Sequence, residues 1–106
     1  MQRKVFISRN MDHSYERAKE FGELVYITEG KVDIFAVGEL YDLIKESMKD
    51  ASEDDLILIS GLSLSNSIAS SIMAYKFGVV NFLLYRKGEY LMKRVIFGLS
   101  KQERGE

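Results

Sequence analysis

The chain has 106 residues, enough for one domain with a buried core and too few for two. Its 46% hydrophobic and 29% charged residues are typical of a globular protein, and its net charge of −1 gives no bulk electrostatic reason to bind nucleic acid or an anionic membrane. Because the chain has no cysteine, disulfides, thiolate catalysis and cysteine-bound metals are excluded.

The first third of the chain alternates between strand and helix patterns. An apolar run over residues 4–8 predicts a first strand, and residues 15–21, with Ser14 as the cap and Gly22 as the stop, predict a short helix. Residues 24–28 have the composition of a second strand. An opening apolar run of five residues is too short for a signal peptide or a membrane span, so we expect a cytoplasmic protein without membrane contact.

The segment over residues 29–37 allows two interpretations, a turn into a further strand over residues 32–37 or a loop that leads to a helix. We favour the strand, because its apolar side chains suit a surface poorly. After Gly38 the pattern predicts a helix with one apolar stripe, formed by Leu40, Leu43, Ile44, Met48 and Ala51. We also assign four aromatic residues to the core: Tyr26, Phe35, Tyr41 and Phe82.

The stretch over residues 55–86 predicts a strand, a loop, a helix and a second strand. Four branched apolar residues, Leu56-Ile57-Leu58-Ile59, predict a strand buried on both faces, as in parallel sheets, and the acidic run over residues 52–55 predicts a turn before it. A loop with one glycine leads into a helical pattern that ends at Gly78, and residues 79–85 follow as a strand. This is one βαβ unit.

The last predicted elements are a turn at residues 86–88 and a returning strand over residues 89–97, which together form an antiparallel edge hairpin. The sequence therefore predicts a three-layer, Rossmann-like α/β fold with a mostly parallel sheet of five or six strands and this hairpin at its C-terminal edge. Residues 1–97 form a single domain in this interpretation, and residues 98–106 form a polar tail.

Short polar side chains follow three of the predicted strands. In a doubly wound sheet, ligands bind beyond the carboxyl ends of the strands, where the strand order reverses. Hydroxyl and amide groups there suit an oxygen-rich ligand such as a nucleotide. The candidate ligand-binding residues are Ser8, Arg9, Asn10, Thr28, Ser60, Gly61, Ser63, Ser65 and Asn66.

Other interpretations of these residues remain open. Serines at a strand-to-helix junction are common as caps and turn formers, so the loop alone also has a structural explanation. The Gly-x-Gly-x-x-Gly fingerprint and the P-loop lysine are missing, which argues against common NAD and ATP sites, and we expect no cofactor. Arg9 is the one cation in the three loops and could pair with a phosphate.

His13 is the only histidine, and beside Asp12 in a polar loop it is the one candidate for acid or base catalysis near neutral pH. A metal site would have to combine Asp12, Glu16 and Glu29 without a second histidine, and we expect none. A basic cluster on the hairpin could meet nucleic acid, although a charged edge that discourages strand addition also explains it. That cluster consists of Arg86, Lys87, Lys93 and Arg94.

The layout of the second half of the chain resembles the CRISPR-associated Rossmann-like sensor domains. The residues that carry the resemblance are Ser60-Gly61-Leu62-Ser63, the helix to Phe77, and the strands over residues 82–85 and 90–96. The resemblance implies a homodimer whose paired loops bind a cyclic oligoadenylate, with Ser8 and residues 60–63 contributing. The loop departs from the Thr-Gly-Gly-Thr-Lys type of that family, and without the lysine the resemblance implies binding rather than cleavage.

Three functions follow from these patterns. The first is a binding or regulatory module, dimeric, with a nucleotide-like ligand at the three loops. The second is a small phosphodiesterase or nuclease that uses His13 and Arg9. The third is a structural or assembly protein that binds no small molecule and uses its hairpin for contacts.

Overall fold

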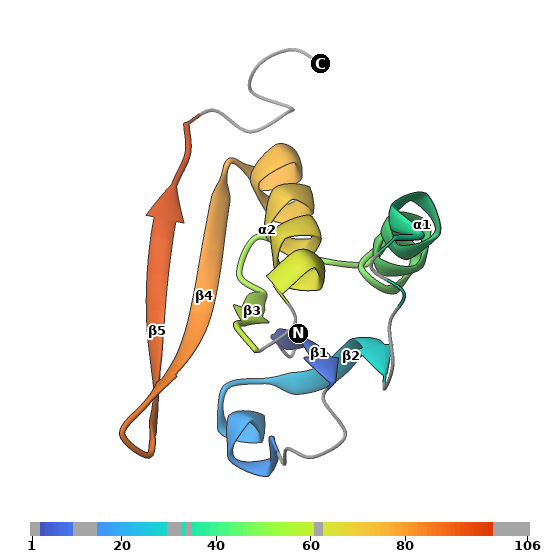
Figure 1. Ribbon diagram of the computed structural model, residues 1–106. Coiled ribbons are helices and arrows are strands. Elements are labelled where there is room, and N and C mark those ends of the chain that lie inside the picture. The colour runs from blue at the N-terminus through green and yellow to red at the C-terminus, as the bar shows by residue number, and fades with distance from the viewer. Residues whose placement is uncertain (1–2, 10–14, 30–32, 34, 61–62, 99–106) are drawn as a thin grey trace.

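The computed structural model describes residues 3–9, 15–29, 33, 35–60 and 63–98, and these residues form one five-stranded sheet with helices on both faces (Figure 1). The strands are β1 Lys4–Arg9, β2 Glu23–Glu29, β3 Leu56–Leu58, β4 Val79–Arg86 and β5 Glu89–Ile96. The helices are the 3₁₀ helix η1 Glu16–Glu20 and the α-helices α1 Val37–Ser47 and α2 Ser63–Phe77.

The strand order is β2-β1-β3-β4-β5, with the first four strands parallel and β5 antiparallel to β4. The chain moves outward from β1 to β2 and then crosses back past β1 to β3. Right-handed crossovers in opposite directions place their helices on opposite faces of the sheet. This order confirms the predicted small α/β fold with an antiparallel edge.

Each face of the sheet has its own core. On one face α1 and α2 pack against Phe6, Ile57 and Val80. On the other face Ala18 of η1 packs against Val5, with partly buried aromatic residues beside it. The short strand β3 is buried on both faces, as its unbroken apolar run predicted.

The segment before α1 corrects the predicted strand over residues 32–37. The helix begins at Val37, before Gly38, and Phe35 lies in a turn with 90% of its surface exposed, so the described part of this segment does not extend the sheet. The strand was predicted from the apolar composition of this segment, and the prediction was wrong because single apolar residues also occur on protein surfaces.

The core assignment was also wrong for Tyr41 and Leu43, which are exposed. Of the predicted stripe, Leu40 and Ile44 of α1 and Met48 directly after it are buried against the sheet, and Ala51 is half-buried against the same core. Tyr26 and Phe82 are half-buried and pack against the two cores, as predicted. The predicted helix over residues 15–21 is the 3₁₀ turn η1, and the predicted cap Ser14 lies outside the described residues.

The C-terminal hairpin has the predicted strands and turn. Lys87 and Gly88 both have positive φ angles, 51° and 84°, which is the backbone of a two-residue hairpin turn of type I′. The carbonyl of Gly88 accepts a hydrogen bond of 2.9 Å from the guanidinium of Arg17, and the rings of Phe21 and Tyr90 form a T-shaped pair with centroids 6.1 Å apart. η1 therefore holds the hairpin tip.

No helix in the described part of the chain has the length and apolar character that a membrane crossing needs.

Candidate functional site

The carboxyl ends of β1, β2 and β3 lie side by side at one edge of the sheet. Arg9 pairs with Glu29 in the β1–β2 ladder, and the β1–β3 register, continued by two residues, brings Ser60 level with Arg9. The strand order reverses between β1 and β3, which is the place where doubly wound folds bind ligands. We call this region the carboxyl edge, formed by Ser8, Arg9, Thr28, Glu29, Ser60, Ser63, Ser65 and Asn66.

Three polar atoms at this edge are buried without a hydrogen-bond partner among the described residues: Ser8 Oγ, Thr28 Oγ1 and Asn66 Oδ1. Their residues are 0%, 3% and 7% exposed, and they belong to β1, β2 and the first turn of α2. Buried polar groups in folded proteins are nearly always paired, and an unpaired one costs about 1–3 kcal/mol. Three such atoms at one edge therefore need an explanation beyond packing.

The side chain of Asn66 is half satisfied. Its Nδ2 donates a hydrogen bond of 2.8 Å to the carbonyl of Ser60, which ties the start of α2 to the chain that leaves β3. This bond fixes the amide in place and leaves Oδ1 as an oriented acceptor. Ser8 and Thr28 lie opposite one another in the β1–β2 ladder, just after a shift of its register.

Removing the unpaired hydroxyl of Thr28 should not weaken the fold. Valine keeps the branched shape of threonine and has no polar atom to leave unpaired, so Thr28→Val should leave the free energy of unfolding unchanged or raise it by up to about 1 kcal/mol. Asn66→Ala is the contrasting variant, because it also removes the bond to Ser60, and should cost about 1 kcal/mol. Urea denaturation measures both. A clear loss of stability in Thr28→Val would mean that its hydroxyl has a partner.

The remaining candidate residues are only partly described. Arg9 is the last residue of β1, and its side chain is not described. Ser63 is exposed and begins α2, whereas Ser65 is buried in the same turn, so neither precedes the helix as a cap. Asn10, Gly61 and His13 lie outside the described residues, as does Asp12.

The basic residues of the hairpin do not form one patch. Lys93 and Arg94 are neighbours on β5 and therefore point to opposite faces. Arg94 also lies 3.4 Å from a carboxylate oxygen of Glu53. Among the described residues no three acidic or histidine side chains are grouped to hold a metal.

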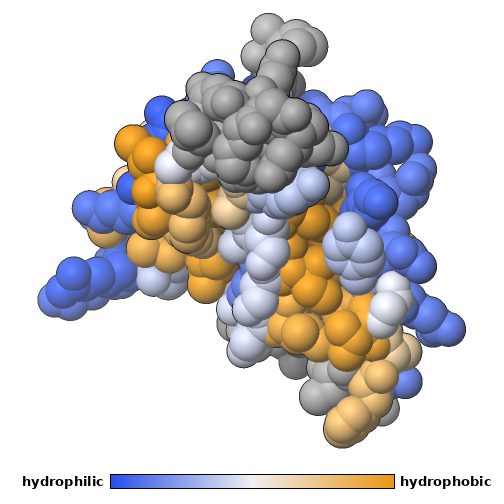
Figure 2. Space-filling model, turned by 90° about the horizontal axis from the view of Figure 1, so that it is seen from above, coloured by the Kyte–Doolittle hydropathy of each residue, from blue (hydrophilic) through white to orange (hydrophobic). Residues whose placement is uncertain are grey.

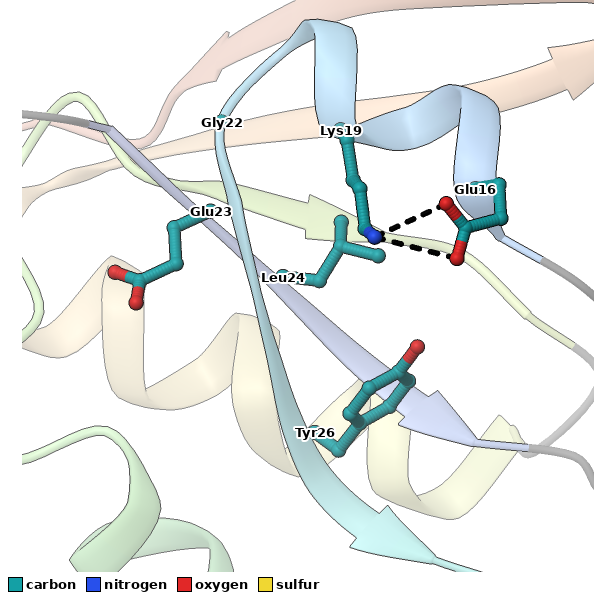
Figure 3. A pocket seen from close by; sticks show the side chains of 6 residues that line it. All are labelled: Glu16, Lys19, Gly22, Glu23, Leu24 and Tyr26. Carbon is teal, nitrogen blue, oxygen red and sulfur yellow. Dashed lines mark hydrogen bonds and ion pairs between the residues drawn. The ribbon is translucent and has the colours of Figure 1, made fainter.

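Two hollows lie away from the carboxyl edge, and the sequence did not indicate them. Figure 3 shows the smaller, about 390 Å³, between η1 and β2, where Lys19 points toward Glu16 and forms an ion pair of 3.0 Å. Both side chains are mostly exposed and the cation is already paired, so the hollow offers little to a ligand.

The larger hollow, about 1040 Å³, is an open groove between α1 and α2, lined by Met48, Ile68 and Ile72 at its base and by charged side chains at its rim. At the rim, a hydrogen bond from Lys49 to Glu46 raises the pKa of the lysine above its ordinary value. The exposed Tyr41 of α1 and Tyr75 of α2 lie on its two sides.

A family model described as Phage Pam3 gp32-like protein matches residues 2–97. No curated protein and no solved structure matches the chain.

Proposed function

The chain belongs to the Phage Pam3 gp32-like protein family, and for this member we propose a binding function in which the carboxyl edge takes an oxygen-rich, nucleotide-like small molecule. The family description names no ligand and no reaction. The proposal therefore rests on the chemistry of the edge.

The observation that supports it is the set of buried polar atoms that have no hydrogen-bond partner among the described residues, near the point where the strand order reverses. Ser8 and Thr28 each offer a hydroxyl, and Asn66 offers an amide oxygen held by its bond to Ser60. A protein that only needed a stable sheet would gain by placing apolar groups at Ser8 and Thr28, whose buried hydroxyls have no partner among the described residues. Polar groups that reduce stability are expected at sites that bind a ligand or an ordered water.

The kind of ligand follows from the groups nearby. Hydroxyl groups donate and accept hydrogen bonds, and an amide oxygen accepts them, which suits a ribose or a base edge. Arg9, at the end of β1, is the cation we assign to a phosphate, and the first turn of α2, at the same edge, supplies the backbone N–H groups of a helix start.

Nucleotide binding should stabilise the folded chain. We expect at least one ligand in a screen of mononucleotides and cyclic oligonucleotides to raise Tm as its concentration increases. The rise should be roughly 10 °C when the ligand concentration is about one hundred times Kd. Ser63→Leu should abolish most of this shift, because it places a branched side chain at the exposed start of α2. Arg9→Ala should reduce the shift in Tm for ligands that carry a phosphate and should leave the shift for a ligand without a phosphate unchanged.

The matched control is Ser71→Leu, the same change two turns further along α2, also exposed. It should keep the full shift. If no nucleotide stabilises the protein, or if both leucine variants respond alike, the carboxyl edge is not the binding site. Turnover of a phosphodiester that His13→Ala abolishes would favour the enzymatic alternative instead.

A further inference from the structure

The sheet has two edge strands, and they differ in how they are covered. β2 has α1 packed against one face and η1 against the other. β5 has seven of its eight residues exposed, with only Tyr90 half-buried. Because neighbouring side chains alternate, Leu91 and Val95 are exposed on one face, and Met92 and Ile96 on the other. Figure 2 shows apolar atoms gathered at the left of the molecule, the side where Figure 1 draws β4 and β5.

The outer side of β5 presents backbone groups for pairing. Phe97 donates its N–H to the carbonyl of Gly78 across the hairpin at 2.7 Å, so the continuous register directs the odd-numbered residues of β5 toward β4. The even-numbered residues, among them Tyr90 and Met92, direct their N–H and C=O groups outward. The chain has no proline and this ladder has no register shift, so two common protections of an exposed edge are missing.

The charges on β5 are arranged to match a second β5. Glu89 and Lys93 point to the same face, and neither has an ionic partner among the described residues. In an antiparallel pair related by a two-fold axis, opposite residues share a face. When Leu91 lies opposite the partner's Leu91, Glu89 lies opposite the partner's Lys93, and the reverse pair forms as well. A shift that brings Lys93 opposite the partner's Lys93 sets like charges against each other.

We infer that β5 pairs antiparallel with β5 of a second copy of this chain, with Leu91 at the two-fold axis. Tyr90 exchanges backbone hydrogen bonds with the partner's Met92, and Met92 with the partner's Tyr90. The two Glu89–Lys93 pairs select the register. The two five-stranded sheets then form one continuous sheet of ten strands. The charges that could have kept another strand away from this edge instead specify which strand pairs there.

This dimer does not depend on the proposed ligand. It keeps the carboxyl edge of one copy apart from the carboxyl edge of the other. A two-fold axis perpendicular to the sheet reverses the strand direction between the copies, so the two carboxyl edges lie on opposite sides of the assembly. Each chain then binds its own ligand. That arrangement differs from the shared site implied by the resemblance to CRISPR-associated sensor domains.

Exchanging the two charges tests the pairing and its register. Sedimentation velocity of the full chain, up to millimolar concentration, should show a reversible monomer–dimer equilibrium. Glu89→Lys or Lys93→Glu alone sets like charges opposite each other twice and should weaken the dimer by about tenfold or more. The double variant Glu89→Lys with Lys93→Glu restores opposite pairs and should return the dimer to near its original strength.

Two further variants separate the edge from general charge effects. Glu23→Lys makes the same charge change on the exposed start of β2 and should leave the dimer unchanged. Met92→Pro removes one outward N–H and should dissociate the dimer, while Met92→Val, which keeps the N–H, should not; circular dichroism confirms that both remain folded. A monomer at every concentration, a dimer that the single reversals do not weaken, or a double variant that stays as weak as the single ones would overturn the inference.

Discussion

Replacing Gly22 with alanine should destabilise the protein by about 3 kcal/mol, the range of severe backbone clashes. Gly22 is buried between η1 and β2, and an added Cβ would overlap the carbonyl oxygen of Arg3 and come within 2.9 Å of its carbonyl carbon. The same oxygen accepts the N–H of Glu23 at 2.8 Å, so the start of β1 cannot move away without losing that bond. Both atoms are backbone, and no side-chain rotation relieves the overlap.

Gly38 provides a matched control with the opposite sign. It lies in the first turn of α1, and an added Cβ meets no atom within 4 Å. Gly38→Ala should therefore raise the free energy of unfolding by about 0.5–1 kcal/mol, because alanine loses less conformational freedom in a helix. Urea denaturation of both variants measures the difference. Equal stability of the two would show that the contact between Gly22 and Arg3 is not rigid.

The sequence predicted the strands well because their signals are local. The run from Leu56 to Leu58 is apolar without interruption, and the turn at Lys87 and Gly88 separates two β-rich segments, so both could be identified from neighbours in the sequence. Gly22 was recognised only as a helix stop. Its contact with Arg3 depends on how two distant segments approach each other, and no local pattern contains that information.

The failures near α1 have a related cause. Helical spacing identifies which residues share a face, but the width of the buried stripe depends on how many neighbours the helix has. Since α1 packs against the core through Leu40 and Ile44, with Met48 directly after it, the apolar Leu43 beside them remains exposed. The position of the carboxyl edge, in contrast, follows from parallel strands alone. Only the structure shows that Thr28 Oγ1 and Asn66 Oδ1 have no hydrogen-bond partner among the described residues, since each could have found one.

Nothing in the sequence indicated the structural role of Asp55, because the acidic run around it predicted only a turn before β3. Its carboxylate is buried and accepts two backbone hydrogen bonds, from Lys4 N at 2.9 Å and from Ser52 N at 2.8 Å. It therefore joins the start of β1 to the turn before β3, at the edge opposite the candidate site. Asp55→Ala would leave both N–H groups without this acceptor and should cost about 3 kcal/mol.

Neighbouring substitutions separate this role from a general effect of charge. Asp54→Ala removes the same charge from an exposed position and should change the stability by no more than about 0.5 kcal/mol. Asp55→Asn keeps one acceptor oxygen and replaces the other with an NH₂ group that faces an N–H. The stability lost in this variant should therefore lie between the losses of the two alanine variants. If Asp55→Asn were as stable as the original chain, one oxygen would be enough to hold the two central strands together. The other of the two bonds would then contribute little to the alignment of the sheet.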